Sequence, residues 1–95
     1  MKIEKAAPPV WRSMLYVPAT SEKFIEKAHE RGADAIKIDL EDAVALAEKP
    51  RARTLVRSAA KIVARGGADV LVRINRPLRM AVDDLEASVW PEVHG

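Results

Sequence analysis

The stretch that decides the fold is Ala35 to Val44, with the sequence Ala-Ile-Lys-Ile-Asp-Leu-Glu-Asp-Ala-Val. Its residues alternate between two faces of a predicted strand, because successive side chains in a strand point to opposite sides. The apolar face carries Ile36, Ile38 and Leu40, and the charged face carries Lys37, Asp39 and Glu41. A carboxylate removed from water is costly unless it is paired, hydrogen-bonded or near a cation. Asp39, Glu41 and Asp42 are therefore expected either in a solvated loop or in a metal-dependent site at the carboxyl edge of a parallel sheet.

The segments before this stretch predict one strand and one helix. Residues 1–10 contain prolines and show no periodicity, so we expect a flexible lead-in. Residues 11–19 include a continuous apolar run, which is typical of a strand that is buried on both faces. Thr20 or Ser21 can cap a helix that ends before Gly32. This part of the chain is predicted to form a βα unit.

The segments after it predict a loop, two helices and a third strand. The loop covers residues 43–48, and a helix begins near Pro50 and ends at Gly66. Alternation predicts a strand over 69–75, and a short helix is expected over 83–89. Three basic residues of the longer helix recur at i, i+4 spacing, which is typical of a solvated helix face: Arg53, Arg57 and Lys61.

Strands that alternate with helices and short loops predict an α/β fold with parallel pairing and right-handed crossovers. A closed (β/α)8 TIM barrel needs roughly 250 residues, and three of its βα units occupy about the length of this chain. Residues 11–95 are therefore expected to form the incomplete, N-terminal part of a barrel domain. We also expect two open sheet edges, which would leave the isolated chain marginally stable.

Composition narrows the class of protein. The chain has no cysteine and a formal net charge of +2, which predicts no disulfide framework and no nucleic-acid partner. Its start lacks a signal-peptide pattern, and no run approaches the ~20 apolar residues of a membrane span. We therefore expect a cytoplasmic protein without a membrane partner.

The polar ends of the second and third strands are expected to meet, because ligands of parallel α/β folds bind at the carboxyl ends of the strands. Arg73 is the candidate anchor for an anionic substrate, since a guanidinium binds a carboxylate through two charge-assisted hydrogen bonds. The alternative is that Arg73 forms an ion pair with Glu41 or Asp39 that only neutralises the site. Lys37 is expected to pair with Asp39, and the functional alternative for Lys37 is a Schiff-base lysine.

Five segments carry a resemblance to a known family: Arg12–Ala19, Gly32–Ala35, Ile38–Val44, Glu48-Lys49 and Val70–Asn75. In this order they resemble the opening of the citrate lyase beta subunit and malyl-CoA lyase group in the HpcH/HpaI aldolase superfamily. The resemblance covers nearly everything from Arg12 to Val93. Its most specific part is Asp-Leu-Glu-Asp-Ala-Val followed later by Val-Arg-Ile-Asn.

The resemblance implies a (β/α)8 barrel that cleaves or forms a carbon-carbon bond between a 2-oxo or 2-hydroxy acid and an acyl-CoA, with Mg²⁺ polarising the acid. It implies that Arg73 holds the substrate carboxylate. Glu41, Asp42 and Asp39 would lie beside the metal and orient its waters. The direct metal ligands are expected from later strands, outside this chain, and the full-length protein is expected to form a homo-oligomer.

The turn at Thr20 and Ser21 is expected to face the CoA, since helix N-termini suit phosphates. Two residues depart from the family pattern: Ala19 stands where many relatives have Gly, and Lys37 replaces a commonly apolar residue.

Three other classes of protein stay open. They are a pyruvate-type class II aldolase of the same superfamily that does not use CoA, a receiver-like phosphoacceptor domain, and a non-catalytic interaction module. Pro18 and Arg73 occupy positions where a receiver domain needs acids, which argues against that class.

Overall fold

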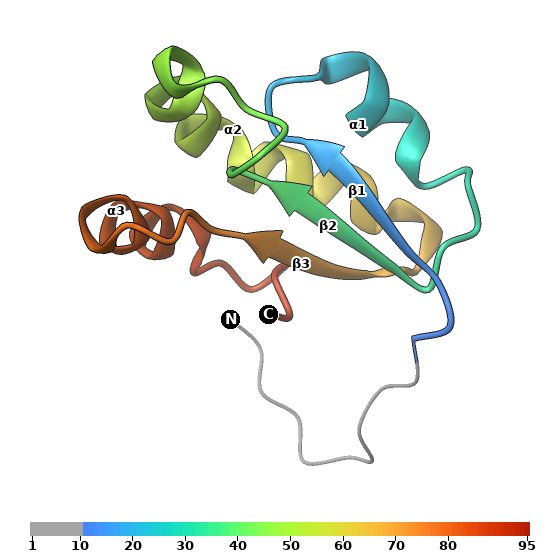
Figure 1. The fold of residues 1–95 in the computed structure, drawn as a ribbon. Coiled ribbons are helices and arrows are strands. Elements are labelled where there is room, and N and C mark those ends of the chain that lie inside the picture. Colours follow the sequence, from blue (N-terminus) through green and yellow to red (C-terminus); the bar gives the residue numbers. More distant parts are fainter. Residues whose placement is uncertain (1–10) are drawn as a thin grey trace.

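The computed structural model of the chain describes residues 11–95, which form an α/β fold around three parallel strands (Figure 1). The strands pair in the order β1-β2-β3. The elements are β1 (Met14–Pro18), α1 (Glu22–Ala28), β2 (Ala35–Asp39), η1 (Leu46–Glu48), α2 (Lys49–Val63), η2 (Ala64–Gly66), β3 (Asp69–Arg73) and α3 (Leu78–Ser88). The predicted α/β class is confirmed. The lead-in predicted for residues 1–10 lies outside the described residues.

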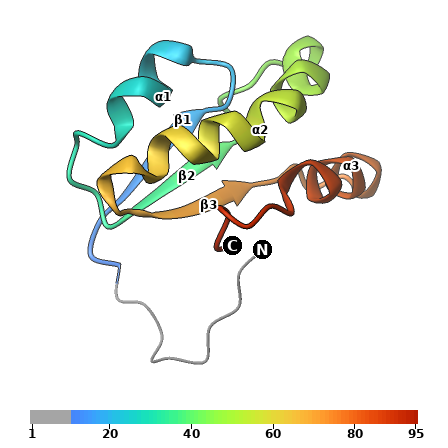
Figure 2. The ribbon, with the colours of Figure 1, turned by 180° about the vertical axis from the view of Figure 1, so that it is seen from behind.

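Helices α1 and α2 cover one face of the sheet, and the other face carries no helix among residues 11–95 (Figures 1 and 2). The alternation of the strands explains this arrangement, because Ile36 and Ile38 are buried beneath the helices whereas Lys37 and Asp39 lie on the uncovered face. The core is aliphatic and draws on every strand and on both covering helices, with Val17, Ile25, Ile36, Ile38, Val56, Val63 and Val70. All helices of the described part are too short or too polar to span a membrane.

The strand register places side chains of the uncovered face in rows. Pro18, Asp39 and Arg73 form the row at the carboxyl ends of the strands. The next row contains Tyr16 and Lys37, together with Leu71 of β3. Because residues in one row point to the same side of the sheet, Arg73 and Asp39 lie next to each other, and Lys37 lies below them.

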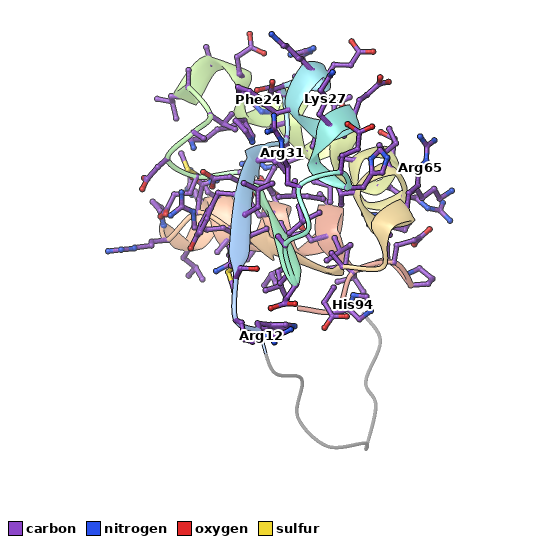
Figure 3. The ribbon with its side chains drawn as sticks, turned by 90° about the vertical axis from the view of Figure 1, so that its right-hand side faces the viewer. Arg12, Phe24, Lys27, Arg31, Arg65 and His94 are labelled. Carbon is purple, nitrogen blue, oxygen red and sulfur yellow. The ribbon has the colours of Figure 1, made fainter. Side chains whose placement is uncertain are left out.

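Only one of the two predicted open edges is open among residues 11–95. On the outer edge of β3, the backbone N–H of His94 donates to Val70 O at 2.7 Å, and the N–H of Val72 donates to Gly95 O at 2.9 Å. The prediction of two open edges was therefore wrong for β3, because the last residues of the chain return to that strand. The edge of β1 faces a cavity of about 320 Å³ that Phe24, Lys27 and Arg31 of the α1 region border (Figure 3).

The three basic residues predicted to form a solvated face of α2 differ in exposure, since Arg53 is partly buried whereas Arg57 and Lys61 are exposed. Arg53 donates from Nε to Asp84 Oδ1 at 2.7 Å, and the Arg57 guanidinium lies 4.6 Å from the ring centroid of Trp90. Lys61 Nζ lies 4.0 Å from Glu92 Oε1. The solvated-face prediction was therefore wrong for Arg53, because α3 packs against this part of α2, and it is confirmed for the exposed Arg57 and Lys61.

Helix α3 begins at Leu78, five residues before the predicted start at Asp83. Pro77, with φ of −54°, precedes the helix and suits its entry. The residues that α3 buries are Asp84 and Ser88. An apolar stripe therefore could not indicate the length of this helix, because its buried positions are polar.

Candidate functional site

The centre of the site is a two-hydrogen-bond ion pair between the last residues of β2 and β3. Arg73 donates from Nε to Asp39 Oδ1 at 2.9 Å and from Nη2 to Asp39 Oδ2 at 2.7 Å. The two residues are register partners, so the sheet itself brings their side chains together. The Asp39 side chain is 1% exposed, whereas Arg73 is 30% exposed and reaches the rim.

Asp39 also receives backbone hydrogen bonds from the turn that follows β2. The N–H of Glu41 donates to Oδ1 at 2.8 Å, and the N–H of Ala43 donates to Oδ2 at 3.0 Å. Each carboxylate oxygen of Asp39 thus accepts two hydrogen bonds, which fills the roughly four acceptor positions of a carboxylate. Asp39 therefore holds Arg73 and the turn in place.

Electrostatics keep this pair ionised. Burial alone would raise the pKa of Asp39, but the hydrogen bonds from Arg73, Glu41 and Ala43 and the charge of Arg73 lower it below the ordinary value of 3.8. The hydrogen bond to Asp39 raises the pKa of Arg73, against the effect of burial, and the nearby acids add to the rise. Both groups are therefore charged at neutral pH.

The pair with Asp39 occupies only one edge of the Arg73 guanidinium. The edge formed by Nη1 and the second proton of Nη2 lies on the side of Asp42, whereas Glu41 lies on the Nε side that Asp39 occupies. Nη1 lies 3.7 Å from Asp42 Oδ2, and Nε lies 3.7 Å from Glu41 Oε1. The Asp42 side chain is 78% exposed, whereas Glu41 is mostly buried. The neutralising pair considered from sequence thus forms with Asp39, and the Nη1/Nη2 edge keeps donors for a further carboxylate.

Two residues that sequence reasoning did not assign to the site fix the backbone of the acidic turn. Lys49 donates from Nζ to Leu40 O at 3.0 Å and to Glu41 O at 2.8 Å. Asn75 Nδ2 donates to Leu40 O at 2.9 Å. The signals for them were weak: Lys49 lies in a family-like segment, and Asn75 ends the face that carries Arg73.

Asp84 of α3 supports this arrangement from a fully buried position. Its Oδ2 accepts hydrogen bonds from Asn75 N and Asn75 Nδ2, both at 2.7 Å, and its Oδ1 accepts the bond from Arg53. α3 is therefore tied both to α2 and to the loop after β3. No feature of the sequence distinguished this aspartate from an exposed one.

Lys37 does not pair with Asp39, so that prediction was wrong. The acceptor positions of Asp39 are filled by Arg73 and the backbone, and Lys37 Nζ instead donates to Tyr16 Oη at 3.2 Å. The Lys37 Nζ and the Arg73 Cζ lie 4.9 Å and 4.7 Å from the Tyr16 ring centroid, respectively. These contacts are cation-π interactions, and they place both cations beside one aromatic ring.

The turn predicted to face CoA begins beside Asp39, because the N–H of Ala19 donates to Asp39 O at 3.1 Å. Ser21 is the N-cap of α1 and accepts a hydrogen bond from Phe24 N at 3.4 Å. Thr20 borders a cavity of about 250 Å³ between α1 and α2. Neither residue contacts Arg73 through a hydrogen bond or an ion pair within the described range.

Residues 11–95 contain no group of three or more histidine, cysteine, aspartate or glutamate side chains that could hold a metal ion. Asp39 has no acceptor position left, but Glu41 and Asp42 still offer carboxylate oxygens at the rim. Mg²⁺ keeps several waters and needs only one or two direct carboxylates. These two acids therefore fit contact with the waters of a magnesium ion better than a complete ligand set.

Together these features define an α/β domain with an arginine-carboxylate site at the carboxyl edge of its parallel sheet. The family profile described as HpcH/HpaI aldolase/citrate lyase matches residues 12–92. The chain belongs to this family.

Curated relatives share substantial identity with the chain. It is 47% identical over 64 residues to citrate lyase subunit beta of Leuconostoc mesenteroides subsp. cremoris, covering 67% of this chain and 21% of the relative. It is 46% identical over 65 residues to a (3S)-malyl-CoA thioesterase of Cereibacter sphaeroides (strain ATCC 17029 / ATH 2.4.9). This match covers 68% of this chain and 23% of the relative. Citrate lyase subunit beta of Escherichia coli (strain K12) is 39% identical to the chain over 79 residues. This match covers 82% of this chain and 26% of the relative. The matched segments thus span about a fifth to a quarter of these relatives.

Proposed function

We propose that this chain contributes the substrate-carboxylate site of a Mg²⁺-dependent carbon-carbon lyase that acts on an acyl-CoA and a 2-oxo or 2-hydroxy acid. In this proposal its three strands are the first three of a (β/α)8 barrel. The observation that carries the proposal is the geometry of Arg73, which Asp39 holds by its Nε/Nη2 edge while the Nη1/Nη2 edge remains at the rim beside the exposed Asp42. The family and the names of its relatives support the reaction class.

Each residue has a defined task in this proposal. Arg73 binds and orients the acid's carboxylate through its Nη1/Nη2 edge, because Asp39 prevents rotation of the guanidinium. Glu41 and Asp42 accept hydrogen bonds from waters of the metal ion. When bound, Mg²⁺ supplies positive charge that stabilises the oxygen on which negative charge develops. Lys49 keeps both acids in place through the turn backbone.

A chimera tests the proposal. Residues 12–92 would replace the matching segment of the E. coli relative, and cleavage of citryl-CoA and malyl-CoA would be measured with Mg²⁺ and with EDTA. We expect Mg²⁺-dependent cleavage of one of the two thioesters. Arg73→Lys should lower kcat/KM about tenfold to a hundredfold, since a lysine cannot present two parallel donors. Arg31→Lys, at an exposed position in the loop after α1, is the matched control.

The outcomes separate the alternative functions. Unchanged kinetics in Arg73→Lys would reduce Arg73 to a charge-balancing role and contradict the proposal. Cleavage of a free 2-oxo acid without any thioester would indicate the class II aldolase. Thioester hydrolysis without carbon-carbon cleavage would instead match the activity for which the Cereibacter relative is named. Binding without turnover would favour an interaction module. A homo-oligomeric, cytoplasmic protein remains part of the proposal, and light scattering and cell fractionation would test it.

A further inference from the structure

The ammonium group of Lys37 lies on the uncovered sheet face, one row below the Arg73–Asp39 pair. Its Nζ donates to Tyr16 Oη at 3.2 Å and lies 4.9 Å from the centroid of that ring. Within residues 11–95, no carboxylate lies within ion-pair distance of Lys37. This lysine therefore has a hydroxyl partner in the described part of the chain but no acidic one.

Arg73 brings a second cation to the same ring, with its Cζ 4.7 Å from the Tyr16 centroid. The two cationic groups are therefore no farther apart than the sum of their two ring distances. Asp39 cannot neutralise Lys37, because Arg73, Glu41 and Ala43 already fill its acceptor positions. Glu41 and Asp42 follow the end of β2, beyond the row of Asp39, and face Arg73. Within residues 11–95 the face thus presents a lysine without an acid beside an arginine whose Nη1/Nη2 edge has only the exposed Asp42, at 3.7 Å.

We propose that Lys37, together with the Tyr16 hydroxyl, binds the second carboxylate of a dicarboxylic acid whose first carboxylate is bound by Arg73. This inference rests on the proposed function and names the substrate class of the same site. Two cations that contact the same aromatic ring can each meet one carboxylate of a short dicarboxylic acid. A monocarboxylic acid contacts Arg73 alone and leaves the ammonium without a counter-charge, which disfavours it. Lys37 is therefore the residue that selects dicarboxylic over monocarboxylic acids.

The test uses two stable ligands that differ by one carboxylate, (S)-malate and (S)-lactate. Calorimetry on the chimera would measure the Kd of each ligand for the unmodified segment and for Lys37→Met. We expect the malate Kd to rise about tenfold or more and the lactate Kd to change less than about twofold, because one charge-assisted hydrogen bond is lost. Lys37→Arg should retain the malate preference. Lys23→Met, an exposed lysine on α1, is the control.

Equal weakening of both ligands, or no change for either, would overturn the inference. So would a lower melting temperature of Lys37→Met with an unchanged malate-to-lactate ratio, because it would show that another acid of the folded domain pairs with Lys37. If Lys37→Met does not fold, Tyr16→Phe removes only the hydroxyl and should still weaken malate selectively. Ligand-detected NMR on the 95-residue chain measures the same ratio independently. A different result would show that the proposed function itself fails: an Arg73→Lys variant would bind malate and lactate with unchanged Kd.

Discussion

Asp39 holds Arg73 by the Nε and Nη2 edge, at 2.9 and 2.7 Å, from a position where its own side chain is 1% exposed. Neighbouring parallel strands place both residues in one row, and the turn after β2 adds two backbone donors to the same carboxylate. The orientation of the arginine is therefore determined by the sheet and by the first residues after it. It does not depend on the exposed acids at the rim.

Asp39→Asn should destabilise the chain strongly. An asparagine side chain cannot accept four hydrogen bonds, and the charge of Arg73 loses its buried counterpart. Breaking a fully buried pair costs about 3–5 kcal/mol, and we expect about 2–3 kcal/mol here because Arg73 is 30% exposed. Urea denaturation followed by circular dichroism would measure the change. Asp42→Asn, which is 78% exposed, should change the free energy of unfolding by less than about 0.5 kcal/mol. A similar loss of unfolding free energy in Asp39→Asn and Asp42→Asn would contradict this prediction.

The stability of the chain should depend on pH through Asp39. The folded-state pKa of this group is lower than its ordinary value of 3.8, so the unfolded state takes up the proton first as the pH falls. The stabilisation is therefore complete above about pH 5 and is lost as the pH falls through 3.8 toward the folded-state pKa. Unfolding free energies between neutral and strongly acidic pH would show this decline. Asp39→Asn should have a flatter profile, and an equally steep one would show that other carboxylates cause the slope.

Asp34 is the control for that profile. Backbone hydrogen bonds from Arg12 and Ser13 and the charge of Arg12 lower its pKa, so its contribution has the same sign. Asp34 lies at the opposite end of β2, where it accepts Arg12 N at 2.7 Å. Asp34→Asn should therefore reduce the acid sensitivity without altering the malate affinity of the chimera, whereas Asp39→Asn should alter both.

Gly66→Ala should destabilise the chain because the backbone of η2 approaches the end of α1 too closely for a side chain. A Cβ atom at Gly66 would lie 2.5 Å from His29 O, which is backbone and cannot rotate away. We expect a loss of about 1–3 kcal/mol in urea denaturation. Gly67→Asn is the control, because Gly67 has φ of +85° with open space around it, and asparagine tolerates that conformation. A stable Gly66→Ala would show that α1 and η2 can separate without cost.

The arrangement of the central strands and the location of the site could be predicted from the sequence. Alternation in Ala35–Val44 separates apolar from charged residues, and parallel pairing of strand ends brings Arg73 to the acids of β2. Both steps need only the period of a strand and the direction of the pairing. The choice between Asp39 and Glu41 as the partner of Arg73 needed coordinates, because it depends on which residue shares the row.

The contacts made by α3 could not be predicted in this way. Arg53 resembles any residue of a solvated helix face until α3 is known to pack beside it. Asp83 and Asp84 are adjacent and chemically identical in sequence, yet their side chains are 61% and 0% exposed. Such differences come from tertiary packing, which a periodic pattern of apolar residues does not encode when the buried side chains are polar.

This contrast between neighbours gives the last prediction. Asp84→Asn should cost about 3 kcal/mol or more, because it leaves Arg53 without its buried counter-charge and weakens the bonds that Asn75 donates. Asp83→Asn should cost less than about 0.5 kcal/mol, since its contact with Arg53 is 3.8 Å long and exposed. Hydrogen exchange would locate the effect, with faster exchange of α3 amides in Asp84→Asn than in Asp83→Asn. Because Asn75 also binds Leu40 O, faster exchange should extend to the acidic turn. If the faster amide exchange in Asp84→Asn were confined to α3, the helix would not be coupled to the site.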